Sequence, residues 1–318
     1  MKDRILGILG PKAFQIQIST FHALGVLIVK ENYEKAGYKA NFTILDSDDS
    51  LTLIKKILKN FNLDPKIYNP KAIRNQISGA KNQLLTAKDY ERYATTEFEQ
   101  IVLKVYGAYE ERLIINNSLD FDDLLMLPIK VFRKYPDVLK HYQERFKYIL
   151  IDEYQDTNEV QYILTKMLSK KRKNLCVVGD ESQSIYAFRG SNYRNILNFE
   201  KDYPNCKIIL LEQNYRSTKT ILNAANDVIK NNKQRKDKRL WTDNHEGDKV
   251  VYKKCIDEKE EAASVASEIG NLIIQGEKLE DIDEVKSIVN NYILVETCDN
   301  FQEIIYELLV RDKNIYLL

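Results

Sequence analysis

Four short apolar runs, each ending abruptly in polar residues, place the strongest constraint on how this chain can fold. They read FQIQIST, FKYILIDE, NLCVVGD and CKIILLEQN and span residues 14–20, 146–153, 174–180 and 206–214. Short runs that are rich in Ile and Val are typical of strands in a parallel sheet that is covered on both faces. The sequence therefore predicts four buried parallel strands.

Helical patterns lie between these runs. Residues 158–171 carry one apolar stripe at helical spacing, and residues 217–232 carry another, with Ser217 as the expected N-cap. Strands that alternate with amphipathic helices are the signature of an α/β fold.

The stretch between the first two runs is too long for an ordinary crossover and reads as helical throughout. Its clearest helix covers residues 46–61, with Ile54, Ile57, Leu58 and Phe61 on one face. Pro128 interrupts a second helical pattern and predicts a kink or a break there. An all-helical insertion within an α/β domain is the simplest interpretation.

The overall charge excludes a general attraction to polyanions. The chain has 48 Lys and Arg against 47 Asp and Glu, a net charge of +1, so a nucleic-acid site must be a local patch. The basic run at 230–239 is either such a patch or a solvated face.

No cysteine or histidine pattern predicts a zinc site, and no apolar run is long enough to span a membrane. We expect a cytoplasmic protein with no membrane partner.

The polar residues after the four runs are the candidate site, because open parallel sheets bind ligands beyond the carboxyl ends of their strands. Phosphoryl transfer needs a carboxylate for Mg²⁺, a group that orients water, and a cation. Asp152, Glu153, Gln183 and Arg216 are residues of those types. However, Ile-Asp-Glu also occurs at 256–258 and 282–284, so by itself the acidic pair could equally be a solvated strand end.

Aromatic residues near the strand ends suit a single-stranded nucleic acid, because flat side chains stack on bases. The candidates are Phe21, His22, Tyr186 and Phe188. The alternatives are that the aromatic rings are core residues, that His22 is structural, and that Tyr154, Gln155 and Asp156 only cap and brace a turn.

Four motifs, in this order and at these spacings, resemble the UvrD, PcrA and Rep group of superfamily 1 DNA helicases. They are STFHALG at 19–25, IDEYQDTNEVQ at 151–161, VVGDESQSIYAFRG at 177–190 and LEQNYRST at 211–218, and the resemblance covers roughly residues 1–280. It implies a RecA-like P-loop NTPase core whose first strands are missing, an inserted helical subdomain, and the start of a second RecA-like core. The implied boundaries are 1–29 with 116–212, then 30–115, then 213–280, leaving 281–318 as an unassigned tail.

The resemblance also implies roles at the nucleotide. Asp152 would hold Mg²⁺, Glu153 would activate water, and Gln183 would sense the γ-phosphate of ATP. Tyr215 would stack on adenine, and Arg216 would act as an arginine finger.

A second set of residues would face DNA: Thr20, Phe21, His22, Tyr186, Phe188 and Arg189. Phe188 stands where family members often carry Trp, so its stacking on a base would be weaker. Arg189 would link the DNA-facing loop to the acidic pair.

One element of the family is missing. ATP binding requires a glycine-rich loop G-x-x-x-x-G-K-[ST], and this chain has no Gly-Lys pair. We therefore expect a fragment of an ATP-dependent 3'-5' DNA helicase that acts on single-stranded DNA and duplex junctions in replication or repair. Hydrolysis would require a complementing N-terminal segment that carries the loop. The alternatives are a catalytically silent DNA- or partner-binding module, or a non-functional remnant.

Overall fold

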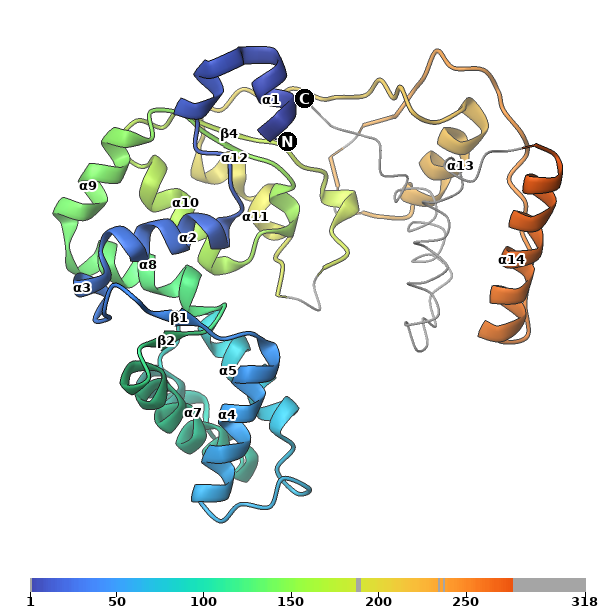
Figure 1. Ribbon diagram of the computed structural model, residues 1–318. Coiled ribbons are helices and arrows are strands. Elements are labelled where there is room, and N and C mark those ends of the chain that lie inside the picture. The colour runs from blue at the N-terminus through green and yellow to red at the C-terminus, as the bar shows by residue number, and fades with distance from the viewer. Residues whose placement is uncertain (1, 187–189, 234, 237, 277–318) are drawn as a thin grey trace. The chain divides into compact units, whose positions relative to one another are not determined.

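The computed structural model describes residues 2–186, 190–233, 235–236 and 238–276 (Figure 1). The chain divides into two compact units, Met1–Pro204 and Asn205–Leu318, and each is described by itself.

Two of the four predicted strands are present, but both are shorter than expected and they are not buried on both faces, since Leu150 is 77% exposed and Cys176 is also exposed. Strand β3 (Ile149–Ile151) pairs in parallel with β4 (Leu175–Val177), and Leu150 lies opposite Cys176. Helix α10 (Glu159–Ser169) connects the strands and buries Val160, Leu164 and Leu168, members of its predicted stripe. This unit confirms the predicted α/β pattern.

The prediction of a strand at 14–20 was wrong. Residues Gly10–Gln15 form a 3₁₀ helix, η1, and Thr20 caps the next helix, α2 (Phe21–Glu31). Phe14 is 81% exposed, so this run has no buried sheet face to occupy.

The predicted strand at 206–214 is also absent. Its only pairing among the described residues is an isolated bridge between Gln213 and Trp241, and Ile209 is 69% exposed. An apolar run forms a strand only where a neighbouring strand exchanges backbone hydrogen bonds along it. Among the described residues Trp241 does so only at the end of this run, donating to the Glu212 carbonyl at 2.9 Å and accepting from Asn214 N–H at 2.7 Å.

Helix α13 (Lys219–Ile229) confirms the second predicted helix but begins after Thr218, not after Ser217. The Asn214 side chain accepts hydrogen bonds from the backbone N–H groups of Arg216 and Ser217, at 2.9 and 2.7 Å. Those bonds hold Ser217 in the turn before the helix.

The helical insertion has a core of its own. Helices α4 (Ser47–Asn60), α5 (Pro70–Lys81) and α7 (Glu97–Ile115) lie together in Figure 1. Their buried residues include Ile54, Ile57 and Leu58, as predicted, and the partly buried Phe61 packs against them. The stretch is not helical throughout, however, because β1 (Thr43–Ile44) pairs in parallel with β2 (Ser118–Leu119).

Helix α8 (Asp123–Lys134) continues through Pro128, so the predicted break does not occur. Proline has no N–H to donate to the carbonyl of Leu124 one turn earlier. The backbone of Gly25 in α2 lies against this carbonyl, so closely that a Cβ at position 25 would be 1.8 Å from the Leu124 oxygen. This close approach packs α2 onto α8.

The remaining helices complete the described residues. The α-helices are α1 (Lys2–Leu9), α3 (Tyr33–Ala36), α6 (Ala87–Tyr90), α9 (Pro136–Arg145), α11 (Arg194–Leu197), α12 (Phe199–Asp202) and α14 (Glu258–Ile274). Three further 3₁₀ helices are η2 (Glu91–Tyr93), η3 (Tyr154–Asp156) and η4 (Glu181–Gln183). Across the described residues, no helix combines the length and the apolar character needed to cross a membrane.

A buried ion cluster joins the helical insertion to α8. The Lys81 ammonium at the end of α5 lies 2.7 Å from Asp120 Oδ2 and 2.8 Å from Asp123 Oδ1, and its side chain is 0% exposed. Burial opposes the charged forms, yet the Lys81 ammonium holds the pKa of Asp120 below its ordinary value. For Asp123 burial outweighs the same attraction and raises the pKa. Such a cluster holds the charged groups in one arrangement, because separating them would leave a buried charge unpaired.

We expect Gly25→Ala to lower the free energy of unfolding by about 1–3 kcal/mol, because the added methyl group would overlap the Leu124 carbonyl. Gly107→Ala in α7 is the matched control, since a Cβ there meets no atom within 4 Å. It should stabilise the chain by about 0.5–1 kcal/mol, because Ala favours a helix more than Gly does. Urea denaturation of the two variants measures both effects, and equal shifts would contradict the close approach.

Candidate functional site

Two of the predicted site loops leave the sheet side by side. Asp152 follows β3 directly, and the loop that contains Gln183 follows β4. Backbone hydrogen bonds continue beyond the strands, from Val178 N–H to the Ile151 carbonyl at 2.8 Å and from Tyr154 N–H to the Val178 carbonyl at 2.9 Å. The carboxyl ends of these parallel strands therefore bring the two loops together.

Glu153 has an unusual backbone conformation for its residue type. Its φ and ψ of 50° and 45° are left-handed, and its N–H donates to Asp152 Oδ1 at 3.0 Å. A non-glycine residue in this conformation costs about 1–2 kcal/mol. The strain lies at the residue whose carboxylate is predicted to activate water.

A buried glutamine connects the two loops. Gln155 Nε2 donates to Glu153 Oε2 at 2.7 Å, and Gln155 Oε1 accepts from Asp180 N–H at 3.0 Å. Asp180 Oδ2 in turn accepts from Gln183 Nε2 at 3.1 Å. One alternative from the sequence was that Gln155 only braces the turn; in the structure, hydrogen bonds also link Glu153 to Gln183 through Gln155 and Asp180.

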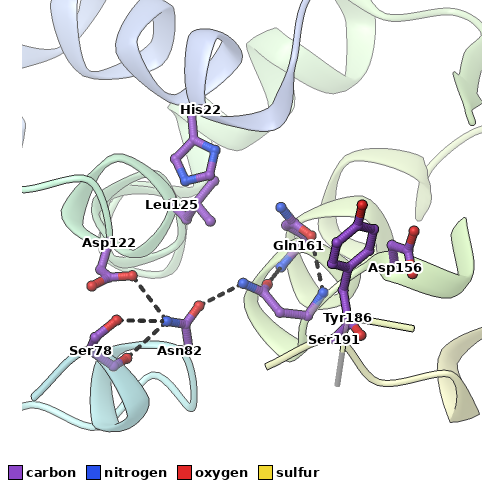
Figure 2. Close-up of a pocket in the computed structure, with 10 residues that line it drawn as sticks. His22, Ser78, Asn82, Asp122, Leu125, Asp156, Gln161, Tyr186 and Ser191 are labelled. Atoms are coloured by element: carbon purple, nitrogen blue, oxygen red, sulfur yellow. Dashed lines mark hydrogen bonds between the residues drawn. The ribbon is translucent and has the colours of Figure 1, made fainter. Parts of the chain in front are cut away.

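A cavity of ≈ 410 Å³ lies beside these loops in the first unit (Figure 2). His22 and Tyr186, two of the predicted DNA-facing residues, line it together with Asp156. The His22 and Phe121 rings lie edge to face, with 6.0 Å between ring centres and 65° between their planes. The structure thus brings together residues from three of the motifs, which extend from residue 19 to residue 190 of the sequence.

The cavity also contains polar residues that the motifs did not indicate. Asn82 Nδ2 donates to Asp122 Oδ1 at 3.0 Å and to the Ser78 carbonyl at 2.9 Å (Figure 2). Asn82 Oδ1 accepts from Asn158 Nδ2 at 2.6 Å. Because Asn158 caps α10, this chain of hydrogen bonds joins the helical insertion to the helix after the acidic loop.

Burial shifts the pKa values of several titratable groups of the cavity in the direction that favours their uncharged forms. It lowers the pKa of His22 and so favours the uncharged imidazole. Burial, with a contribution from nearby Asp120, raises the pKa of Asp122. Burial, followed by the neighbouring charge of Glu153, raises the pKa of Asp156 to about 6. Asp156 Oδ1 is buried and has no hydrogen-bond partner among the described residues.

Thr20 and Phe21 have structural roles that account for their positions. Thr20 Oγ1 accepts from Ala23 N–H at 3.3 Å and so caps α2, and Phe21 packs against the core that contains Ile28 and Leu164. Phe188 and Arg189 lie outside the described residues. Their predicted contacts with DNA stay predictions.

Tyr215 and Arg216 belong to the second unit. Tyr215 is 78% exposed, and its hydroxyl donates to Gln213 Oε1 at 2.7 Å. The Arg216 backbone N–H is held by Asn214, as described above. An exposed ring on an anchored turn is available for stacking.

The residues present fit a magnesium ion that arrives with a nucleotide. Asp152 is an exposed carboxylate at a strand end, and no group of three potential metal ligands occurs in the part of the chain that the structure describes. Mg²⁺ is commonly held by one or two carboxylates together with waters and substrate phosphates.

We expect Asp156→Asn to stabilise the chain more at pH 7.5 than at pH 5. A carboxyl group whose pKa rises to about 6 on folding favours the folded state while protonated, and loses that contribution as the pH rises through 6. Asp137→Asn is the control, because the hydrogen bond from Lys35 lowers the pKa of Asp137. Asp137→Asn should lower the free energy of unfolding at pH 7.5, and should lower it less in acid. Denaturation as a function of pH measures both variants, and parallel curves for Asp156→Asn and the parent would contradict the shift.

Comparison with known proteins agrees with the geometry. Residues 1–204 match the family described as the UvrD/REP helicase N-terminal domain, and residues 209–293 match the UvrD-like helicase C-terminal domain.

Individual relatives are similar over most of the chain. "ATP-dependent DNA helicase PcrA" of Bacillus subtilis (strain 168) is 52% identical over 283 residues, which cover 89% of this chain and 38% of that protein. The protein of the same name from Staphylococcus aureus (strain Mu50) is 49% identical over 282 residues, 89% of this chain and 39% of its own length. The chain thus spans less than half the length of these relatives. By sequence, motifs and site geometry, it belongs to the UvrD/PcrA-type helicase family.

Proposed function

We propose that the chain provides the hydrolytic loops and part of the DNA-facing surface of an ATP-dependent 3'-5' DNA helicase. One observation carries the proposal: the hydrogen-bonded connection between Glu153 and Gln183 at the carboxyl ends of two parallel strands. The base that activates the attacking water and the amide that senses the γ-phosphate must lie at the same phosphate group. The hydrogen bonds that link Glu153 to Gln183 hold their two loops together.

In the proposed reaction, Asp152 would hold Mg²⁺, which would neutralise charge on the phosphates, and Glu153 would accept a proton from the attacking water. Gln183 would sense the γ-phosphate, and Arg216, as an arginine finger, would neutralise the negative charge that develops on it. Tyr215 stacks on adenine, in keeping with its exposed ring.

The proposed DNA path uses six residues on the first unit, which are Thr20, Phe21, His22, Tyr186, Phe188 and Arg189. Two of them line the polar cavity. Single-stranded DNA and duplex junctions are the proposed substrates, in replication or repair. The UvrD-type family and the DNA helicases that the chain resembles support this choice.

We also propose a complementing segment that supplies the glycine-rich loop. The β3–β4 sheet has one uncovered face in the described residues, where Leu150 is 77% exposed and the paired Cys176 is also exposed. A RecA-like sheet is covered on both faces. In this arrangement 1–29 with 116–212 form the first core, 30–115 the helical subdomain and 213–280 the start of the second core, with 281–318 unassigned.

A second candidate is a module that binds DNA without hydrolysing ATP. It is favoured by the lack of a Gly-Lys pair in these 318 residues. The measurements below separate the two candidates.

We expect the 318-residue chain alone to show no measurable ATP hydrolysis. Co-expression with a segment that carries the family's first two strands and loop should produce DNA-stimulated hydrolysis. In that complex Glu153→Gln should lower kcat at least about 100-fold, because it removes the general base. Glu144→Gln is the control, since Glu144 is exposed and pairs only with Lys171 among the described residues. A complex that folds but never hydrolyses ATP would support the silent module.

We expect single-stranded DNA to bind the chain in a salt-sensitive way, with aromatic stacking contributing about 1–3 kcal/mol per base. Tyr186→Ala and Phe188→Ala should each weaken binding. Tyr93→Ala is the control, because Tyr93 is an exposed tyrosine of the helical insertion. Fluorescence anisotropy at several salt concentrations measures the affinities. Equal affinities for all three variants would limit binding to nonspecific charge contacts.

A further inference from the structure

We propose that Gln155 is a positioning residue, which holds the Glu153 carboxylate where it accepts the proton of the water that attacks the γ-phosphate, and which couples Glu153 to Gln183. This inference rests on the proposed function and deepens it. It assigns a role to a side chain that contacts neither nucleotide nor DNA in the proposed reaction.

Both ends of the Gln155 amide are engaged. The side chain is 1% exposed, its Nε2 donates to Glu153 Oε2 at 2.7 Å, and its Oε1 accepts from Asp180 N–H at 3.0 Å. A hydrogen bond to a charged carboxylate is stronger than one between neutral groups. Because the amide is buried and held at its oxygen, its N–H₂ group has a fixed direction in which to hold the carboxylate.

The chain leaves space for this amide at Gly179. A Cβ at position 179 would lie 2.5 Å from Gln155 Oε1 and 3.1 Å from Tyr154 N. A side chain there would push the Gln155 amide away from the Asp180 backbone. Gly179 therefore permits the contact between the two loops.

The Glu153 side chain needs such a support. The residue is exposed and lies on a left-handed turn, where an unsupported carboxylate would sample several rotamers. A base that must abstract a proton acts only within hydrogen-bond reach of its water. The hydrogen bond from Gln155 favours the Glu153 rotamers in which Oε2 points towards the Gln155 amide.

The same amide connects the base to the proposed phosphate sensor. Asp180 presents its N–H to Gln155 and its carboxylate to Gln183, whose Nε2 lies 3.1 Å from Asp180 Oδ2. Asp180 Oδ1 also accepts from Ser182 N–H at 2.9 Å, which fixes the turn. A displacement of Gln183 on contact with the γ-phosphate is thereby transmitted to the position of Glu153.

The first test compares Gln155→Met with the parent chain in the complemented complex. Met has a similar length and no amide, so it removes the hydrogen bonds to Glu153 and Asp180, and the longer one to Asp156 Oδ2 at 3.5 Å, while filling the space. We expect kcat to fall about 10- to 100-fold, with the KM for ATP changed by less than about threefold, because ground-state binding is untouched. Gln143→Met is the matched control. Gln143 is a partly buried glutamine outside the candidate site, and its side chain donates to the Met167 carbonyl at 2.7 Å. It should leave both constants unchanged.

The second variant, Gln155→Glu, gives a readout that a merely structural role would not produce. When ionised, the introduced carboxylate repels Glu153, and when protonated it can again donate to Glu153 and accept from Asp180. We expect its kcat relative to the parent to rise at least about fivefold between pH 8 and pH 6, as a proton restores the donor. A constant ratio over this range would overturn the positioning role.

A third measurement uses the 318-residue chain without its complement. Hydrogen exchange at the Asp180 amide should be faster in Gln155→Met than in the parent and unchanged in Gln143→Met. Unchanged exchange in Gln155→Met would contradict the connection between the loops. If Gln155→Met fails to fold, the pH dependence of Gln155→Glu decides.

The outcomes distinguish this inference from the proposed function. Parent complexes that hydrolyse ATP, with an unchanged kcat in Gln155→Met, would overturn the role of Gln155 alone. Parent complexes that fold without hydrolysing ATP would overturn the proposed function and the positioning role with it.

Discussion

The buried ion cluster around Lys81 is the interaction on which the arrangement of the first unit depends. One ammonium faces two carboxylates at 2.7 and 2.8 Å, and the Tyr109 hydroxyl donates to Asp120 at 3.1 Å. Because an unpaired charge at this depth is costly, the end of α5 has few alternative positions against the start of α8. The next residue, Asn82, is thereby held where it bonds Asn158 and Asp122, and the polar cavity forms around these contacts.

Local patterns were sufficient to predict the elements that bury a stripe or a sheet face. Helices α4 and α10 follow their apolar spacing, and β3 and β4 lie within Ile- and Val-rich runs. The runs at 14–20 and 206–214 looked alike but are not strands, because strand formation depends on a neighbouring edge and not on composition alone. The N-cap of α13 differed by one residue, since Asn214 holds Ser217 outside the helix.

In the candidate site, too, the sequence predicts some residues and only the structure shows the others. Motif order indicated Glu153 and Gln183, and the parallel pairing of β3 with β4 brings their loops together. Nothing local predicts that Asn82 bonds Asn158, because 76 residues separate them and each Asn fits equally well at a solvated helix end. The sequence likewise does not predict the hydrogen bonds that join Gln155 to Glu153 and Asp180, because they depend on the close approach that Gly179 allows.

The left-handed backbone of Glu153 lowers the stability of the fold at the same position where the proposed hydrolysis needs a carboxylate. A chain selected only to fold would carry Gly or Asn there, since both adopt a φ of 50° at lower cost. Glu153 carries its carboxylate despite that strain. The hydrogen bonds from Gln155 Nε2 to Glu153 and from Asp180 N–H to Gln155 hold the turn in place. Substitutions of Glu153 that make this loop more stable are therefore expected to impair the proposed hydrolysis, because glycine, the residue that fits the turn at the lowest cost, has no carboxylate to accept a proton.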